Sequence, residues 1–157
     1  MAQNISVGQE APDFTLMDMN GQIVSLHEYR GKTPIVLIFY PKDNTPGCTR
    51  QMCAVRDAEA DYIDAGAVVL GLNGDSASSH QSFVAKHNLT VRLLTDKGLD
   101  VARRYNAVMG IGPVAIVNRT VVVVGTDGVV RFYERGTPAT PKILAAIEES
   151  KAAAGAA

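Results

Sequence analysis

The sequence predicts an α/β fold in which helices cover one mixed β-sheet. Short apolar runs with the composition of buried strands alternate along the chain with segments of helical spacing, a pattern typical of layered α/β domains. Two further pairs of apolar runs flank tight-turn signals, and such hairpins add antiparallel strands to a parallel centre. With 157 residues the chain has the length of one domain, which we assign to residues 1–157.

A hairpin and a buried strand begin the predicted fold. Residues 14–16 and 23–25 lie on either side of Asn20-Gly21, a dipeptide that favours a tight turn, so we expect an antiparallel pair. Residues 34–40 then form a continuous apolar run rich in β-branched side chains. This composition predicts a strand that is buried on both faces.

Helices alternate with strands through the middle of the chain. A loop at residues 41–47 precedes the first of them. We expect Ser78 or Ser79 to cap the second helix, because a serine hydroxyl accepts a hydrogen bond from the first turn. The expected order is a helix that ends at Gly66, a strand over 67–72, a helix over 78–87, a strand around 93–94 and a short helix over 100–105.

The last part of the chain predicts a second hairpin and a final helix. Residues 114–124 and 129–133 are apolar and flank Thr126-Asp127-Gly128, a strong turn signal. Residues 140–150 form the last helix, and we expect the alanine-rich tail at 151–157 to fray. The whole order suits a thioredoxin-like fold with a mixed central sheet, helices on both faces and an N-terminal β-hairpin extension.

Composition limits the classes of partner and the compartment. A formal net charge of -1 gives no reason to expect nucleic acid or an anionic membrane as a partner. We see neither a signal peptide nor an apolar run of the roughly 18 residues that a membrane span needs. We therefore expect a cytoplasmic protein, in which two neighbouring cysteines are more often catalytic or metal-binding than structural. The three histidines have no zinc-like spacing, so we expect no metal and no cofactor.

Cys48 is the strongest candidate for a reactive side chain. It follows the loop that leaves the buried strand and falls at the start of a predicted helix. The free N–H groups and the dipole of a helix N-terminus favour a thiolate, which is the reactive form of cysteine. A cysteine can also be a small buried apolar residue. The second cysteine, Cys53, lies five positions further on and favours a functional role.

The spacing of the two cysteines predicts a conformational change. In a regular helix the Cα atoms of Cys48 and Cys53 would lie about 9 Å apart. A disulfide needs a Cα separation of about 4.4–6.8 Å. Oxidation of this pair would therefore require the start of the helix to unwind.

The segment around Cys48 resembles the active site of peroxiredoxins. Their motif, Pro-x-x-x-Thr-x-x-Cys, is matched by Pro41, Thr45 and Cys48. The segment is most similar to the bacterioferritin comigratory protein or peroxiredoxin Q group, the atypical 2-Cys type, in which a resolving cysteine follows five residues later. The similarity extends from about Val7 to Ile147.

The resemblance implies a peroxidase that reduces hydrogen peroxide and organic hydroperoxides. Cys48 would form a sulfenic acid, and Cys53 would convert it to an intramolecular disulfide that thioredoxin or a similar dithiol protein reduces. Thr45 would hydrogen-bond the sulfur and the peroxide, and Pro41 would shield the intermediate. Tyr40 and Gly47 would join Cys48 in binding the substrate. The resemblance also implies a monomer or a weak dimer.

The family has an arginine on a late strand, and its best match here is Arg119. This residue interrupts the apolar run 114–124, where an arginine is costly to bury unless it meets an anion such as a thiolate at Cys48. Alternatively, Arg119 lies at a strand edge in water.

Two rival functions use the same cysteines. A protein disulfide oxidoreductase on this fold would need Cys-x-x-Cys, which is absent. A non-enzymatic redox sensor or holdase that uses the same disulfide switch stays open as an alternative.

Overall fold

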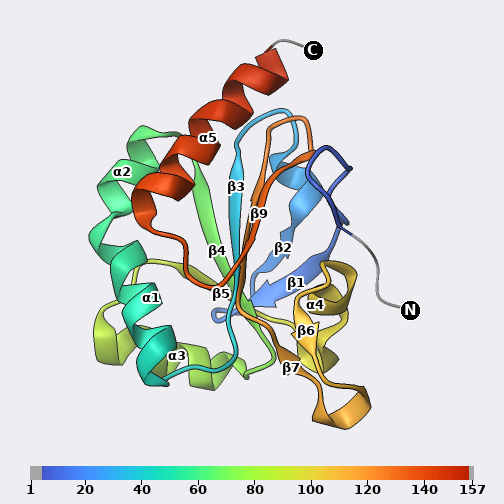
Figure 1. Ribbon diagram of the computed structural model, residues 1–157. Coiled ribbons are helices and arrows are strands. Elements are labelled where there is room, and N and C mark those ends of the chain that lie inside the picture. Colours follow the sequence, from blue (N-terminus) through green and yellow to red (C-terminus); the bar gives the residue numbers. More distant parts are fainter. Residues whose placement is uncertain (1–4, 156–157) are drawn as a thin grey trace.

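The computed structural model describes residues 5–155, which form a seven-stranded mixed sheet surrounded by helices (Figure 1). The order of strands across the sheet is β2-β1-β5-β4-β3-β8-β9. These strands are β1 (Thr15–Asp18), β2 (Ile23–Ser25), β3 (Ile35–Phe39), β4 (Val68–Asn73), β5 (Arg92–Thr95), β8 (Thr120–Val124) and β9 (Val130–Arg135). A separate two-stranded sheet consists of β6 (Val108–Met109) and β7 (Ile116–Val117).

The helices alternate with the strands along the chain. The α-helices are α1 (Pro46–Asp57), α2 (Glu59–Asp64), α3 (Ala77–His87), α4 (Asp100–Arg104) and α5 (Thr140–Gly155). Short 3-10 helices are η1 (Leu26–Tyr29), η2 (Lys97–Leu99) and η3 (Gly112–Val114). Within residues 5–155, none of the helices combines the length and the apolar character that crossing a membrane requires.

The centre of the sheet is parallel and its edges are antiparallel, as the sequence predicted. β4 pairs in parallel with both β3 and β5. The predicted hairpins appear as the antiparallel pairs β1–β2 and β8–β9. All five residues of β3 are buried, because this strand lies between β4 and β8 and has helices over both faces.

Two apolar cores lie on opposite faces of the sheet. Side chains alternate along a strand, so Phe39 and Tyr40 at the end of β3 face different cores. One core contains Phe39 and side chains of α4, and the other contains Tyr40, Cys48 and side chains of α1, α2, α3 and α5. Figure 1 shows α4 on the side of the sheet away from α1 and α2. The thioredoxin-like arrangement with helices on both faces is thus confirmed.

The apolar run 114–124 is not one strand, which corrects the prediction. Its first residue, Val114, ends η3, and its next part contains β7, which pairs with β6 outside the main sheet. Asn118 N–H donates a hydrogen bond to the carbonyl of Ala107, and the chain enters β8 only at Thr120. The polar pair Asn118 and Arg119 marks the break between the two sheets.

Three element boundaries also differ from the prediction. The first predicted helix is divided at Ala58 into α1 and α2. Ser76, rather than Ser78 or Ser79, caps α3, since its hydroxyl accepts a hydrogen bond from Ser79 N–H at 3.2 Å. α5 continues to Gly155, so residues 151–155 of the tail are helical, as the high helix propensity of alanine favours. Residues 156–157 lie outside the described residues.

Candidate active site

Cys48 lies in the first turn of α1, directly after the loop that leaves β3. Thr45 occupies the N-cap position with an extended backbone, and Pro46 begins the helix, where its missing N–H is not needed. The Cys48 side chain is 0% exposed and belongs to the core beneath α1. The unpaired N–H groups of this turn and the helix dipole favour a thiolate at the buried sulfur.

Arg119 meets Cys48 at the end of the sheet where β3 ends and β8 begins. Phe39 pairs with Thr120 in the antiparallel register, so Arg119 lies beside the loop that follows β3. Its Nη2 atom is 3.1 Å from Cys48 Sγ. Arg119 is half-buried rather than at a solvated edge, and its positive charge favours the anionic sulfur. The structure brings these two predicted residues together.

Gln51 orients the guanidinium and was missed by the sequence analysis. Arg119 Nη1 donates a hydrogen bond to Gln51 Oε1 at 2.6 Å. Gln51 is buried and lies three residues after Cys48, so both side chains occupy one face of α1. This i, i+3 spacing is the signal that could have identified Gln51. The guanidinium thus holds Cys48 with one nitrogen and Gln51 with another.

Gly47 is the point at which the helix backbone approaches the guanidinium. A Cβ atom at this position would lie 3.3 Å from Arg119 Nη2 and 3.9 Å from Arg50 Nη2. The first distance is tighter than an ordinary van der Waals contact. Glycine therefore leaves room for Arg119 to reach Cys48. The predicted contact of Gly47 with substrate stays a prediction.

Thr45 and Pro41 lie in the loop before α1. The Thr45 hydroxyl donates a hydrogen bond to the carbonyl of Lys42 at 2.9 Å, so in this conformation its proton is directed into the loop. Pro41 is half-buried between β3 and α1. Tyr40, predicted to contact substrate, is 0% exposed and its hydroxyl donates to Asp43. The functions that the resemblance implies for these three residues stay predictions.

Cys53 lies in the same unbroken helix as Cys48. Both are free thiols in the described chain, and α1 runs without interruption from Pro46 to Asp57. Cys53 is partly exposed and packs against the core that contains Cys48. Because the helix is intact, the two residues keep the five-residue helical spacing that is too long for a disulfide.

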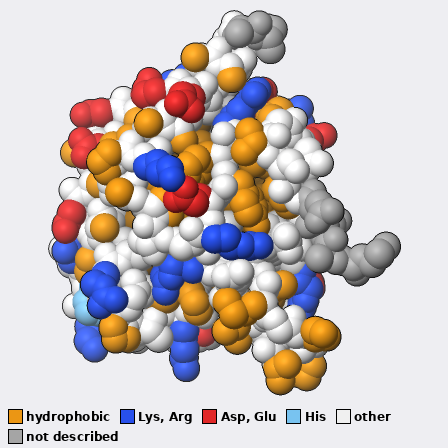
Figure 2. Space-filling view, viewed as in Figure 1, with side chains coloured by type: hydrophobic (Ala, Val, Ile, Leu, Met, Phe, Trp, Pro, Cys, Tyr) orange, Lys and Arg blue, Asp and Glu red, His pale blue; other side chains and the backbone are white. Residues whose placement is uncertain are grey.

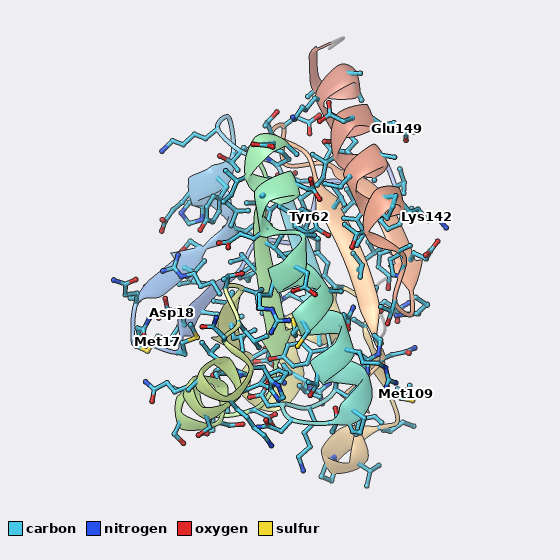
Figure 3. All side chains as sticks on the ribbon, turned by 90° about the vertical axis from the view of Figure 1, so that its left-hand side faces the viewer. Met17, Asp18, Tyr62, Met109, Lys142 and Glu149 are labelled. Atoms are coloured by element: carbon cyan, nitrogen blue, oxygen red, sulfur yellow. The ribbon has the colours of Figure 1, made fainter. Side chains whose placement is uncertain are left out.

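A hollow beside α1 gives access to the guanidinium. It has a volume of about 410 Å³ and is lined by Gly47, Arg50, Gln51, Ala54, Arg119 and Thr137. On the same end of the molecule, the segment from β6 to β7 exposes apolar side chains, which Figure 2 shows as an orange group near the foot of the molecule. They are Met109, Ile111, Val114 and Ile116, exposed by 47%, 86%, 73% and 52%. Figure 3 shows Met109 at the end of the molecule where α1 begins.

The fold is thioredoxin-like, and its site holds a buried thiol in the first turn of a helix. A guanidinium lies at hydrogen-bond distance from this thiol, and a second thiol lies in the same helix. These features together define the class of thiol-based redox proteins. Comparison with known proteins identifies the particular family. Residues 7–133 match the family model of the AhpC/TSA family. The chain belongs to this family, and within it to the peroxiredoxin Q and Bcp group of peroxiredoxins.

Three relatives illustrate the similarity. The chain is 48% identical over 101 residues to chloroplastic peroxiredoxin Q of Triticum aestivum, a match that covers 64% of this chain and 46% of the wheat protein. It is 46% identical over 106 residues to a protein named as a peroxiredoxin bcp in Coxiella burnetii, covering 68% of this chain and 70% of that protein. The crystal structure of peroxidoxin BcpB from Mycobacterium tuberculosis superposes with a TM-score of 0.85 at 27% identity, covering 93% of this chain and 98% of that one. The chain thus spans about half the length of the plant relatives that it matches.

Proposed function

We propose that the protein is a thiol peroxidase that reduces hydrogen peroxide and organic hydroperoxides. The observation that carries the proposal is the 3.1 Å separation between Arg119 Nη2 and Cys48 Sγ in the first turn of α1. This arrangement supports a thiolate that is ready to attack an electrophilic oxygen, because helix dipole and guanidinium both favour the anion. Membership of the peroxiredoxin Q and Bcp group supports the same activity.

The first step oxidises Cys48. The thiolate attacks the terminal oxygen of the hydroperoxide, the O–O bond breaks, and the sulfur becomes a sulfenic acid. The leaving alkoxide or hydroxide takes up a proton and departs as an alcohol or water. Arg119 stabilises the charge that moves from sulfur to the leaving oxygen. Thr45 contributes a hydroxyl to the sulfur and the peroxide once substrate is bound, and Pro41 shields the sulfenic acid.

The second step forms a disulfide. The Cys53 thiol gives up its proton and attacks the sulfenic sulfur, the S–O bond breaks, the hydroxide leaves with that proton as water, and the S–S bond joins the two cysteines. Because an intact α1 keeps Cys48 and Cys53 too far apart, the first turns of the helix unwind before this step. Thioredoxin or a similar dithiol protein then reduces the disulfide and is itself oxidised. We further propose a cytoplasmic location and a monomeric or weakly dimeric state.

Turnover with a dithiol reductant tests the proposal. The wild-type protein should consume peroxide continuously when thioredoxin, thioredoxin reductase and NADPH are supplied. Cys48→Ser should abolish the reaction, whereas Cys53→Ser should consume one equivalent of peroxide and then stop. If the wild-type protein reacts with peroxide no faster than free cysteine does, the peroxidase proposal fails. Oxidation of Cys48 without turnover would instead favour a redox sensor.

A further inference from the structure

A buried polar cluster lies beneath the loop that leads to Cys48, and the proposed reaction steps do not use it. Its centre is the carboxylate of Asp43, a residue that is only 5% exposed. The donors come from the end of β3, from β4 and from α3, so the cluster joins three elements. Asp43 Oδ1 accepts hydrogen bonds from Tyr40 Oη at 2.6 Å and from Asn73 Nδ2 at 3.1 Å. Asp43 Oδ2 accepts one from Ser79 Oγ at 2.8 Å and lies 2.7 Å from His80 Nδ1.

His80 is held at both ring nitrogens by this geometry. Its side chain is 0% exposed, and its Nε2 atom faces the carbonyl of Leu94 at 3.2 Å while Nδ1 faces Asp43. A carbonyl oxygen can only accept a hydrogen bond, and the Asp43 carboxylate is already accepting from three other donors. Both ring nitrogens therefore face hydrogen-bond acceptors, and the ring is fixed at two points.

Asp43 is the carboxylate partner of the His80 ring. Burial by itself raises the pKa of Asp43, but the hydrogen bonds from His80 and Tyr40 outweigh burial and hold that pKa below its usual range. The two residues thus form a buried pair whose side chains are 0% and 1% exposed. Removal of the His80 ring leaves the buried Asp43 carboxylate without one of its partners, which is unfavourable.

The loop that carries Asp43 is tied down at its backbone as well as at its side chain. Asn44 turns the chain with a φ of 63°, in the left-handed region that asparagine adopts more readily than other non-glycine residues. Asp43 N–H also donates to Asp75 Oδ2 at 2.8 Å, which fixes the backbone of the loop as well as its side chain. Thr45, the N-cap of α1, follows directly after Asn44. The anchored loop therefore leads directly into the N-cap of α1.

We propose that His80 is a positioning residue that holds the first turn of α1 in its intact form and thereby controls the balance between peroxide attack and disulfide formation. The inference rests on the proposed function. The intact turn places Cys48 beside Arg119, which suits the attack on peroxide. The unwound turn brings Cys48 to Cys53, which suits disulfide formation. Loss of the His80 contact releases the loop and shifts the population toward the unwound form.

His80→Asn tests the proposal, with His87→Asn as a matched control at the other end of α3. His87 packs edge-on against the Phe83 ring, away from the Asp43 cluster. In His80→Asn the rate of Cys48 oxidation by peroxide should fall about tenfold and the rate of disulfide formation should rise about tenfold, as expected for loss of a hydrogen bond to a charged group. His87→Asn should change neither rate. A slower oxidation of Cys48 together with a faster disulfide formation supports His80 as a positioning residue. A decrease in both rates, or no change in either, overturns the proposal.

Hydrogen exchange measures the balance between the intact and the unwound first turn of α1 in the absence of peroxide. Backbone amides of residues 49–51, whose hydrogen bonds close the first turn of α1, should exchange about tenfold faster in reduced His80→Asn, while amides of β3 should stay as protected as in the wild type. Ser79→Ala removes a smaller donor from the same carboxylate oxygen and should shift exchange in the same direction to a lesser extent. This milder variant keeps the test valid if His80→Asn does not fold.

The two proposals can fail separately. A wild-type protein that consumes no peroxide would overturn the peroxidase function, and hydrogen exchange would still report on the loop. Unchanged exchange of residues 49–51 in both His80→Asn and Ser79→Ala, in a protein that does turn over peroxide, would overturn the positioning proposal alone.

Discussion

Phe39 and Thr120 pair across β3 and β8, and this register places Arg119 beside the loop that leads to Cys48. The two residues of the site are 71 positions apart in the chain, yet Arg119 Nη2 lies 3.1 Å from Cys48 Sγ. A shift of one residue in the pairing would turn the alternating side chains of β8 to the opposite faces of the sheet. The central strand pair of the sheet therefore sets the geometry of the reactive thiol.

Removal of the Arg119 guanidinium should slow the reaction with peroxide. We expect Arg119→Met to lower the second-order rate constant of Cys48 oxidation about 100-fold, because a donor aimed at the developing charge is lost. Arg50→Met is the matched control, since Arg50 lines the same hollow. Competition with a second peroxidase for hydrogen peroxide measures both constants. Equal decreases in the two variants would show that only the general positive potential matters.

A methyl group at Gly47 should disturb the same contact from the helix side. Gly47→Ala would place a Cβ 3.3 Å from Arg119 Nη2, so the guanidinium has to move. We expect a decrease of about tenfold in the rate of peroxide reduction, equivalent to a weakened charged hydrogen bond. Gly155→Ala, where an added Cβ meets nothing within 4 Å, is the control and should leave the rate unchanged. A fully active Gly47→Ala protein would mean that Arg119 tolerates the displacement.

Oxidation should unwind the start of α1 and expose it to proteases. Arg50 lies between the two cysteines, within the turns that must open for Cys48 to reach Cys53. We expect trypsin to cleave after Arg50 about tenfold faster in the oxidised protein than in the reduced protein, because local opening limits cleavage within helices. Mass spectrometry of the fragments measures this rate.

Cys53→Ser treated with one equivalent of peroxide is the control for this experiment. It forms the sulfenic acid but has no second thiol with which to form the disulfide, so cleavage after Arg50 should stay slow. An oxidised wild-type structure with Cys48 and Cys53 bonded inside a regular helix would contradict the prediction.

The ion pair of Asp18 and Arg92 should make stability depend on pH. Burial raises the pKa of Asp18, but the hydrogen bond from Arg92 at 2.7 Å and those from the backbone outweigh it, so the pKa lies below its usual value. A carboxyl group whose pKa is lower in the folded than in the unfolded protein stabilises the folded state at pH values above its unfolded-state pKa of about 3.9. This stabilisation is lost as the pH falls through the pKa that the group has in the folded state. Asp18→Asn should thus lower the free energy of unfolding by about 1 to 2 kcal/mol at pH 7, and the difference should shrink below about pH 4.

Urea unfolding at several pH values measures this difference. Figure 3 shows Asp18 on the N-terminal hairpin, away from α1, so peroxide reduction at pH 7 should not change in Asp18→Asn. In an Arg92→Met background the effect of Asp18→Asn at pH 7 should be smaller. A difference between the wild-type protein and Asp18→Asn that is constant from pH 7 to pH 3 would contradict the assignment.

Most of the fold could be predicted from local patterns. The strand over residues 34–40 and the two hairpins were predicted because apolar runs and turn residues act over short distances. The break at Asn118 was missed, because an apolar run does not show which sheet each part of it joins. The cap of α3 was misplaced by two or three residues within a serine-rich stretch, where several hydroxyls could accept the bond.

The site was only partly predictable for a related reason. Cys48 and Cys53 are near neighbours in the sequence, and their spacing in a helix carries information by itself. His80 has no such signal, because the Asp43 carboxylate that it contacts lies 37 positions earlier and only the packing of α3 against the loop joins them. Nothing in a single sequence distinguishes this histidine from the exposed His27.

In the proposed cycle, the complete burial of Cys48 separates the oxidant from the reductant in time. Another protein cannot bring its own thiol to a sulfur that is 0% exposed while α1 is intact. Only after the helix opens does an S–S bond become available to a large partner. In the proposed cycle a large dithiol partner therefore acts only after α1 has opened, and the order of the two steps follows from accessibility alone.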